Sequence, residues 1–191
     1  MIYIIRHGQT ELNNARVLQG RSDHPLNEKG LLQAREAGRR LKEQGIVFDR
    51  VFSSPLIRAM QTARLVAPET EPVVDDRLIE MDYGPYEGAD LKRLSPELTA
   101  FFRDFAHTPA PEGMEQLSSV VSRMGAFLEE ISGLSGNILI STHAIAMKGA
   151  LEYLTPAAEG RFWSTYIGNC AVYAAENADG RIGVPEEITL P

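Results

Sequence analysis

The chain has 191 residues, 43% of them hydrophobic and 24% charged, a composition typical of an ordinary soluble globular protein. This length suits one domain with a substantial core, so we expect residues 1–191 to form a single domain. The net charge of −7 argues against a nucleic-acid partner, and no basic run indicates binding to a membrane.

An apolar run at residues 1–5 predicts the first strand, because it is rich in β-branched and aromatic residues and lacks a helical period. Arg6, His7 and Gly8 follow it directly. In open α/β sheets the carboxyl ends of the strands are where ligands bind. A guanidinium can hold a phosphate and a neutral imidazole can attack one. For these three residues alone, a structural role is an equal alternative.

Helical patterns alternate with further strands along the chain. Asn27 can cap a helix over residues 28–44, and Pro55 can open a second helix that reaches residue 67. Apolar spacing predicts a third helix over residues 114–132, and a fourth over residues 144–154. This alternation predicts a three-layer α/β/α sandwich with a mostly parallel central sheet.

Three other candidate strands are each followed by a polar residue that could act on a phosphate. Arg58 comes after the run at residues 46–52, Glu80 after the run at 72–79, and His143 after the run at 137–142. If these strands run parallel in one sheet, two arginines, two histidines and a carboxylate meet at one edge. Ordinary solvent-exposed loops have no reason to place two arginines, two histidines and a carboxylate with such complementary chemistry at one edge.

Several short motifs therefore follow one another in a defined order. They are Arg6-His7-Gly8-Gln9-Thr10, Gln19-Gly20, Ser53-Ser54-Pro55-Leu56-Ile57-Arg58-Ala59, Leu78-Ile79-Glu80 and Ser141-Thr142-His143. This ordered set resembles the histidine phosphatase superfamily, the phosphoglycerate mutase-like group, over nearly the whole chain. Gln9 stands where that family usually has glutamate, and Ala144 where glycine is commoner, but neither change removes a catalytic group.

The resemblance implies a role for each of five residues. His7 would be the nucleophile that carries the phosphoryl group, and it must be neutral to attack. Arg6, Arg58 and His143 would surround the transferred group, and the two guanidiniums would disfavour protonation of His7. Glu80 would protonate the leaving oxygen and then help to deprotonate water. Phosphoryl transfer depends mostly on positioning and electrostatic stabilisation, so these groups are sufficient.

Other residues are expected to contact the substrate. By the same resemblance they are Asn13, Gln19, the backbone of Gly20, Tyr83 and Ala144. Residues 85–112 would form a small helical cap over the active site, and its aromatic residues, with Tyr83, would select the leaving group. The alternative for most of these aromatics is the core of an ordinary subdomain. His24 and His107 are expected to be exposed.

We expect no metal and no cofactor. The histidines lack zinc spacing, and Glu80 with Asp82 is too small a carboxylate set for magnesium. Cys170 is the single cysteine, which excludes an intramolecular disulfide and indicates a core thiol in a late strand at residues 169–174. The apolar start is too short for a signal peptide or membrane span, so a cytoplasmic location is expected.

Three functions are consistent with the sequence. The leading one is a metal-independent phosphomonoesterase that acts on a small phosphorylated metabolite through a phosphohistidine. The second is a phosphoglycerate mutase, which returns the phosphoryl group to another hydroxyl, although the compact chain favours hydrolysis. The third is a non-catalytic module that binds phosphorylated ligands, against which the filled catalytic positions count. The oligomeric state stays open, a homodimer included.

Overall fold

The computed structural model describes residues 1–189, and a six-stranded sheet in the order β3-β2-β4-β1-β5-β8 lies at its centre. The strands of this sheet are β1 (Ile2–Arg6), β2 (Arg50–Ser53), β3 (Val73–Val74), β4 (Ile138–Thr142), β5 (Val172–Ala175) and β8 (Glu186–Ile188). β3, β2, β4 and β1 are parallel, whereas β5 and β8 run antiparallel to their neighbours. A short hairpin of β6 (Asn177–Ala178) and β7 (Arg181–Ile182) stands apart from the sheet.

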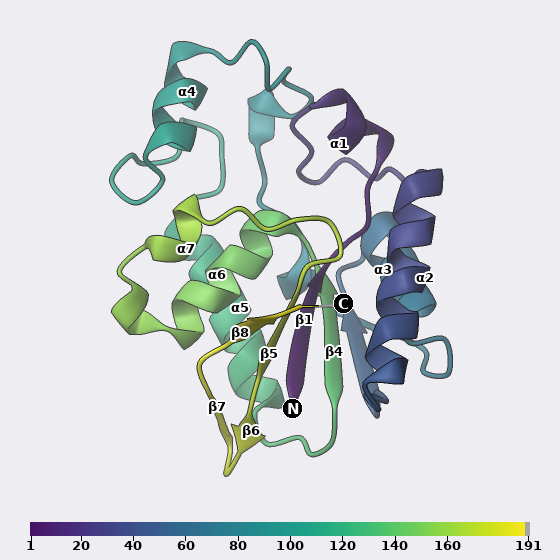
Figure 1. Ribbon diagram of the computed structural model, residues 1–191. Helices are drawn as coiled ribbons and strands as arrows, with labels where there is room; N and C mark the ends of the chain where they lie inside the picture. The colour runs from purple at the N-terminus through teal and green to yellow at the C-terminus, as the bar shows by residue number, and fades with distance from the viewer. Residues whose placement is uncertain (190–191) are drawn as a thin grey trace.

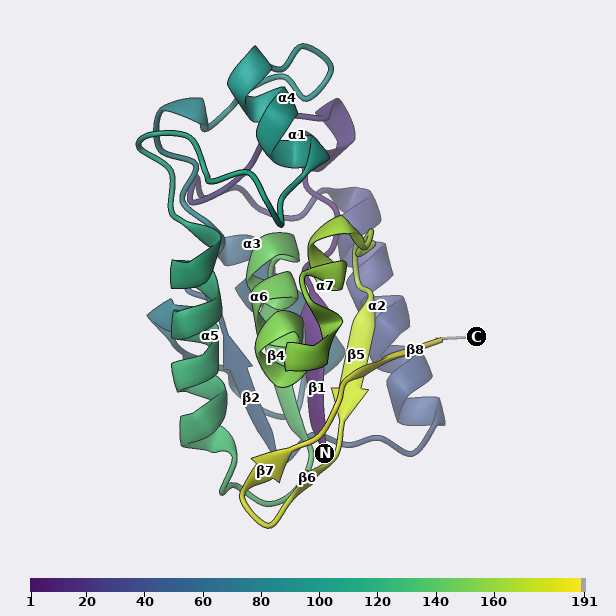
Figure 2. The same cartoon turned by 90° about the vertical axis from the view of Figure 1, so that its left-hand side faces the viewer.

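Helices cover both faces of the sheet. They are α1 (Glu11–Ala15), α2 (Glu28–Glu43), α3 (Ile57–Val66), α4 (Pro96–Arg103), α5 (Leu117–Ile131), α6 (Ala144–Leu154) and α7 (Arg161–Ser164), with 3-10 turns η1 (Asp76–Leu78), η2 (Gly84–Tyr86) and η3 (Pro156–Ala158). α2 and α3 pack on one face, and α5 and α6 pack on the other (Figure 1, Figure 2). The predicted three-layer α/β/α sandwich with a mostly parallel sheet is therefore confirmed.

The position of β1 inside the sheet explains why residues 2–5 are all apolar. Ile2 and Ile4 are buried in the core on the α5 and α6 side, and Tyr3 and Ile5 in the core on the α2 and α3 side. Successive side chains of a strand point to opposite faces, so a strand covered on both faces needs no polar positions. The fully buried run ends at Arg6, which is the last residue of β1 and the first residue of the site.

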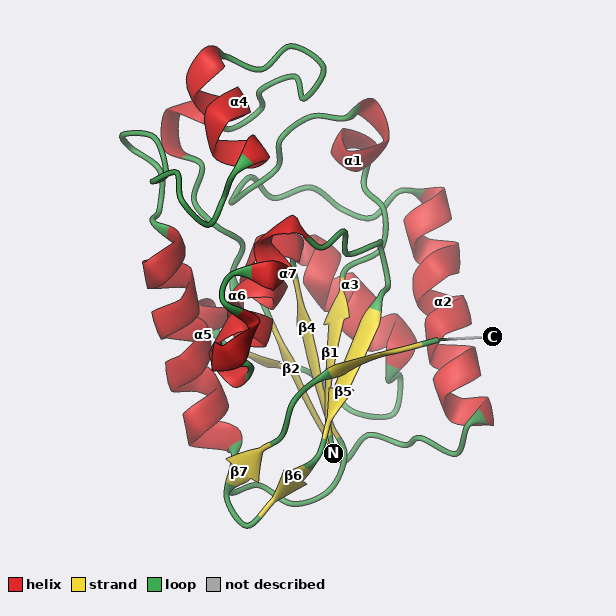
Figure 3. Cartoon of the chain, turned by 60° about the vertical axis from the view of Figure 1, so that its left-hand side comes forward, coloured by secondary structure: helices red, strands yellow, loops and turns green. Residues whose placement is uncertain are grey.

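The strand order brings three of the polar strand ends together. β4 lies between β2 and β1, and its register pairs Thr142 with Arg6 and Ser141 with Ser53. The three strands run in the same direction, so their carboxyl ends lie at one edge of the sheet (Figure 3). The residues that follow these strands are consequently neighbours in space.

Two strand predictions extended too far. The run at residues 46–52 becomes strand only from Arg50, and the run at 72–79 only at Val73–Val74, before the turn η1. Asp75 ends that strand, because its carboxylate accepts hydrogen bonds from the backbone and the side chain of Arg77. Local side-chain bonds of this kind compete with the sheet ladder.

The observed starts of two helices also differ from the predicted ones. The second helix begins at Ile57 and not at Pro55, and the third begins at Leu117 and not at 114. Cys170 is a buried free thiol, as expected, but it lies in the turn before β5 with a φ of 56°. Its prediction as a strand residue was therefore wrong.

The segment 85–112 carries α4 and lies beyond the carboxyl edge of the sheet, at the top of Figure 1. Two backbone hydrogen bonds hold this segment against the residues that follow α1. Leu18 N–H donates to the Ala89 carbonyl at 2.8 Å, and Leu91 N–H donates to the Arg16 carbonyl at 2.9 Å. This is where the sequence places a cap; its part in substrate selection stays a prediction. Within the described residues, every helix is too short or too polar to traverse a lipid bilayer.

Candidate active site

His7 is held at the end of β1 with its ring in a defined orientation. Its backbone N–H donates to the Thr142 carbonyl at 2.9 Å, and its carbonyl accepts from the Asn169 amide at 3.1 Å. The ring Nδ1 lies 2.7 Å from the carbonyl oxygen of Gly8. A carbonyl can only accept, so Nδ1 carries the proton and Nε2 keeps its lone pair. Nε2 is therefore the ring nitrogen of His7 that is available to act as a nucleophile.

The surroundings keep His7 neutral. The side chain is buried, and this burial is the main cause that holds the pKa of His7 well below its usual value near 6.5. The guanidiniums of Arg6 and Arg58 lower the pKa further, because a second positive charge is unfavourable beside them. A neutral imidazole is the form that can attack phosphorus.

Arg58 lies in the first turn of α3, as the sequence predicts, and it is fully buried. Its terminal nitrogens donate to the carbonyls of Ser22 at 2.8 Å and Gly20 at 2.5 Å. Within residues 1–189, no carboxylate lies at ion-pair distance from it. Its positive charge is thus fixed in place by carbonyl groups and not by a direct ion pair, which suits an anionic ligand.

His143 follows β4 and is the residue before the first turn of α6. Its ring centroid lies 5.1 Å from that of His7. Arg58 Nε donates to its Nδ1 at 3.2 Å, so the proton of the neutral ring is on Nε2, which lies 2.7 Å from the Ser54 hydroxyl oxygen. Burial first, and Arg58 second, hold the pKa of His143 well below 6.5.

Glu80 is buried at the N-terminus of α6. Its Oε1 accepts from the N–H groups of Met81 at 2.9 Å and Ala146 at 3.0 Å, and its Oε2 accepts from Ile145 at 3.2 Å. A helix N-terminus attracts an anion, and the anion at this one is the carboxylate of Glu80. Glu80 follows the turn η1 and not a strand.

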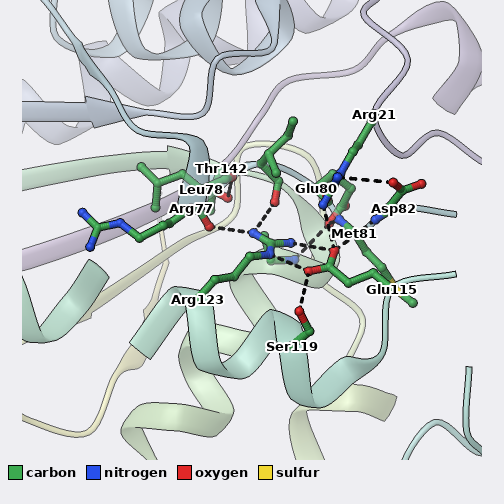
Figure 4. A network of polar contacts seen from close by, with 12 residues as sticks. Arg21, Arg77, Leu78, Glu80, Met81, Asp82, Glu115, Ser119, Arg123 and Thr142 are labelled. Carbon is green, nitrogen blue, oxygen red and sulfur yellow. Dashed lines mark hydrogen bonds and ion pairs between the residues drawn. The ribbon is translucent and has the colours of Figure 1, made fainter. Parts of the chain in front are cut away.

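A partly buried ion pair between Arg123 and Glu115 fixes the backbone on both sides of Glu80 (Figure 4). Arg123, on α5, donates to the carbonyl of Ile79 at 2.6 Å, and its Nε donates to Glu115 at 2.8 Å. Glu115 in turn accepts from the N–H of Asp82 at 3.1 Å. Burial is the largest single influence and raises the pKa of Glu115, but the hydrogen bonds and charge of Arg123, the N–H of Asp82 and the charge of Arg21 together outweigh it, so the net pKa is lowered. We call Arg123 and Glu115 the clamp.

Two buried donors near the site have no partner in the described part of the chain. They are Nε of Arg6 and Nε2 of Gln19. One terminal nitrogen of Arg6 donates to the Ile167 carbonyl at 2.6 Å, and Oε1 of Gln19 accepts from the Thr10 hydroxyl at 2.7 Å. Each side chain is thus anchored by one atom while another is free to donate. Buried donors left free in this way are expected where a ligand binds.

The predicted substrate contacts differ in their surroundings. Asn13 donates to Gln19 at 3.4 Å and lies beside that free amide. Gly20 has both backbone groups engaged, since its N–H donates to Glu87 at 2.9 Å and its carbonyl accepts from Arg58. Tyr83 is buried, and its pKa is raised well above 10, first by burial and then by Glu80. The roles of these residues toward a substrate stay predictions.

Ala144 needs no glycine-like backbone. It is the first residue of α6, and among the described residues the non-glycine positions with positive φ are Arg16, Glu159, Cys170 and Asp179. The alanine therefore brings no strain to the residue next to His143.

Sequence reasoning missed the residues that hold the site together. Thr62 accepts from the N–H of Gly8 at 3.1 Å and donates to the carbonyl of Arg58 at 2.8 Å. Glu87, which the sequence does not distinguish from a solvated acid, anchors the backbone at Gly20 and Ser22. The bonds from Gly8 to Thr62 and from Gly20 and Ser22 to Glu87 join segments far apart in the chain, so no local sequence pattern predicts them. In residues 1–189, no group of three or more histidine, cysteine or acidic side chains is arranged to hold a metal ion.

Comparisons with known proteins identify the family of the chain. The profile of the histidine phosphatase superfamily (branch 1) matches residues 2–186. A 2,3-bisphosphoglycerate-dependent phosphoglycerate mutase of Nitrobacter winogradskyi is 33% identical over 171 residues, which cover 82% of this chain and 83% of the relative. A Hydrogenobacter thermophilus protein that its name assigns to the phosphoserine phosphatases is 29% identical over 177 residues, 90% of this chain and 86% of the relative. The crystal structure of a phosphoglycerate mutase from Thermus thermophilus has a TM-score of 0.75 at 27% identity, covering 98% of this chain and 99% of that one.

Proposed function

The chain belongs to the histidine phosphatase superfamily (branch 1), and on that premise we propose that it hydrolyses phosphomonoesters through a phosphohistidine on His7. One observation carries the proposal: the neutral ring of His7 is fixed by Gly8 so that Nε2 is the nucleophilic atom, beside Arg6 and Arg58. The sequence expectation of a metal-independent reaction is part of this proposal.

The first step forms the phosphoenzyme. Nε2 of His7 attacks phosphorus, and the bond between phosphorus and the ester oxygen breaks. Arg6 and Arg58 stabilise the negative charge on the transferred oxygens, with His143 beside them. Glu80, which must first take up a proton, gives it to the leaving oxygen, so the alcohol departs neutral.

The second step returns the enzyme to its starting state. Glu80, now a carboxylate, takes a proton from a water molecule that attacks phosphorus. The bond between phosphorus and Nε2 breaks, and inorganic phosphate leaves. The three backbone N–H donors at Met81, Ile145 and Ala146 stabilise the carboxylate between the two steps.

We propose a small phosphorylated metabolite as the substrate. The relatives are named for phosphoserine and for phosphoglycerates, which are both small phosphomonoesters. A phosphoglycerate mutase is the second candidate, favoured by the Nitrobacter relative at 33% identity. The two functions share the first step and differ in whether water or a second hydroxyl accepts the phosphoryl group. A pure binding module would need neither Glu80 nor the clamp that holds it.

The test is hydrolysis of p-nitrophenyl phosphate in EDTA by the wild type, His7→Ala and the control His107→Ala. His107 is 82% exposed and bonds only to Asp104 among the described residues. We expect turnover in the wild type and the control, and a loss on the order of 10⁴-fold in His7→Ala, because the nucleophile is gone. Activity that survives in His7→Ala excludes the mechanism. Release of 2-phosphoglycerate from 3-phosphoglycerate faster than free phosphate identifies a mutase.

A further inference from the structure

Glu87 takes no part in the proposed reaction, yet its carboxylate binds the backbone of a loop beside Arg58, residues 20–23. Its two oxygens accept from the N–H of Gly20 at 2.9 Å and 3.0 Å. One of them also accepts from Ser22, from the N–H at 3.3 Å and from the hydroxyl at 2.5 Å. Three donors of one short loop thus converge on a single carboxylate. Hydrogen bonds to an ionised group are stronger than neutral ones, so they hold the loop firmly.

The same loop holds Arg58 from its other side. The carbonyl of Gly20 accepts from one terminal nitrogen of Arg58 at 2.5 Å, and the carbonyl of Ser22 accepts from the other at 2.8 Å. Asp23, the next residue, accepts at 2.7 Å from the N–H of Ile57, which is the first residue of α3. The loop therefore fixes both the guanidinium and the start of the helix that carries it.

Gly20 shows how closely the loop and Glu87 fit together. A Cβ there would come within 2.6 Å of Oε2 of Glu87 and of the carbonyl oxygen of Met81, and within 2.7 Å of the Tyr83 ring. Real Cβ atoms essentially never make contacts this short, so the position requires glycine. The loop is thus packed directly against residues 81–87, and the carboxylate of Glu87 bonds to its backbone.

Glu87 also supplies negative charge near Arg58 without occupying its donors. Burial lowers the pKa of this guanidinium, and the charges of Glu80, Asp23 and Glu87 oppose the shift. Three of its five N–H groups donate to carbonyls and to His143 within the described residues, so the others remain for a phosphoryl group. Glu87 therefore acts on Arg58 through the loop and leaves the guanidinium available to an anion.

The alternative is that Glu87 only fastens the segment 85–112 to the rest of the chain. Two backbone hydrogen bonds between residues 16–18 and residues 89–91 already do this. The carboxylate instead binds the two residues whose carbonyls accept from Arg58. Its position therefore matches support of the arginine better than attachment of the segment.

We propose that Glu87 is a positioning residue: through the backbone of Gly20 and Ser22 it fixes the guanidinium of Arg58 against the transferred phosphoryl group. The proposal rests on the proposed phosphomonoesterase function, and it makes the segment 85–112 part of what builds the phosphate site. Without this carboxylate the loop relaxes, and Arg58 stabilises the charge on the transferred oxygens less well.

The first measurement is the Kd for orthovanadate, which mimics the transferred phosphoryl group in its five-coordinate state, by isothermal titration calorimetry. We expect Glu87→Ala to weaken vanadate binding by about 10-fold to 100-fold and to lower kcat on p-nitrophenyl phosphate by a similar factor, because a misplaced charge stabilises that state less. Glu87→Gln should weaken binding by about 5-fold, since its amide oxygen can still accept from the loop.

Asp49→Asn is the matched control for the change from carboxylate to amide. Asp49 accepts from the N–H of Asn137 at 2.7 Å and so also joins two distant segments. Both residues precede their strands, β2 and β4, so they lie at the edge of the sheet opposite the site. The control should bind vanadate as the wild type does.

The Kd separates positioning from loss of fold, because misfolded enzyme lowers kcat and the binding stoichiometry but leaves the Kd unchanged. A double variant then shows whether the effect passes through Arg58. We expect Glu87→Gln combined with Arg58→Met to bind vanadate within about 2-fold of Arg58→Met alone. An unchanged Kd in both Glu87 variants, or an equal loss when Glu87→Gln is added to the wild type and to Arg58→Met, overturns the proposal.

This measurement also separates the role of Glu87 from the function on which it rests. A wild type that binds vanadate without hydrolysing p-nitrophenyl phosphate counts against the phosphomonoesterase function. The comparison of Kd values still decides the role of Glu87, because binding needs no turnover.

Discussion

At the scale of single residues, the site depends on two buried histidines whose protons are placed by their neighbours. His7 donates from Nδ1 to the Gly8 carbonyl, whereas His143 accepts at Nδ1 from Arg58. The first ring therefore offers Nε2 as a base and the second carries a proton there. Opposite tautomers, 5.1 Å apart, allow one ring to attack while the other donates a hydrogen bond.

These neutral histidines predict how stability depends on pH. The pKa of each ring is lowered in the folded state, so below about pH 6.5 the unfolded chain binds protons that the folded chain does not. The free energy of unfolding should thus fall with decreasing pH, by up to about 1.4 kcal/mol per pH unit for each histidine. Urea unfolding of the wild type and His143→Gln between pH 7 and 5 measures this slope, with His107→Gln as the matched control. Equal slopes in the wild type and His143→Gln would contradict a neutral, buried His143.

At the scale of elements, the proposed catalytic groups are held by packing between segments. The loop after β1 presses against the start of α2 so closely that a Cβ on Gly8 would come within 2.5 Å of the Gly30 carbonyl oxygen. On the other side of the sheet, α5 supplies Arg123 of the clamp, and α6 supplies N–H groups that bind Glu80. The carboxylate is thereby fixed by a helix end and by backbone contacts on both sides of it.

The clamp predicts a defect that depends on the leaving group. Arg123→Met should displace the backbone around Glu80 and lower kcat for an alkyl phosphate by about 10-fold to 100-fold, as small misplacements of a catalytic group do. p-Nitrophenyl phosphate should lose less, because its good leaving group needs little protonation. KM should change little for either ester.

Arg50→Met is the matched control for the clamp, since Arg50 also donates to a carbonyl, that of Ser135, away from the site. A thermal unfolding scan separates loss of fold from loss of rate. If Arg123→Met slows both esters to the same extent, the clamp does not act through Glu80.

At the scale of the whole molecule, the sequence predicts the layers and the meeting of the catalytic groups well. Apolar runs and helical spacing are local signals, and the rule that parallel strands share a carboxyl edge turns them into a site. Arg6, His7 and His143 were placed by this reasoning, and Arg58 by the motif at the start of α3.

The sequence could not predict how those groups are oriented. Glu80 was taken to follow a strand, but Asp75 ends that strand early and the carboxylate is positioned by α6 instead. The partners of Arg58 and the clamp come from segments distant in the chain. Glu87 looks like any loop acid until the tertiary structure places it against Gly20 and Ser22. Burial and long-range hydrogen bonds are properties of the packed molecule, so a single sequence does not display them.

The central claim is that His7 carries the phosphoryl group on Nε2, and trapping the phosphoenzyme tests it most directly. A phosphomonoester is mixed with the enzyme, the reaction is stopped in alkali, which preserves phosphohistidine, and the phosphorylated peptide is analysed by mass spectrometry and ³¹P NMR. We predict one phosphoryl group on Nε2 of His7, absent from His7→Ala. A phosphoryl group on another residue, on Nδ1, or nowhere in an enzyme that turns over the same ester would contradict the account.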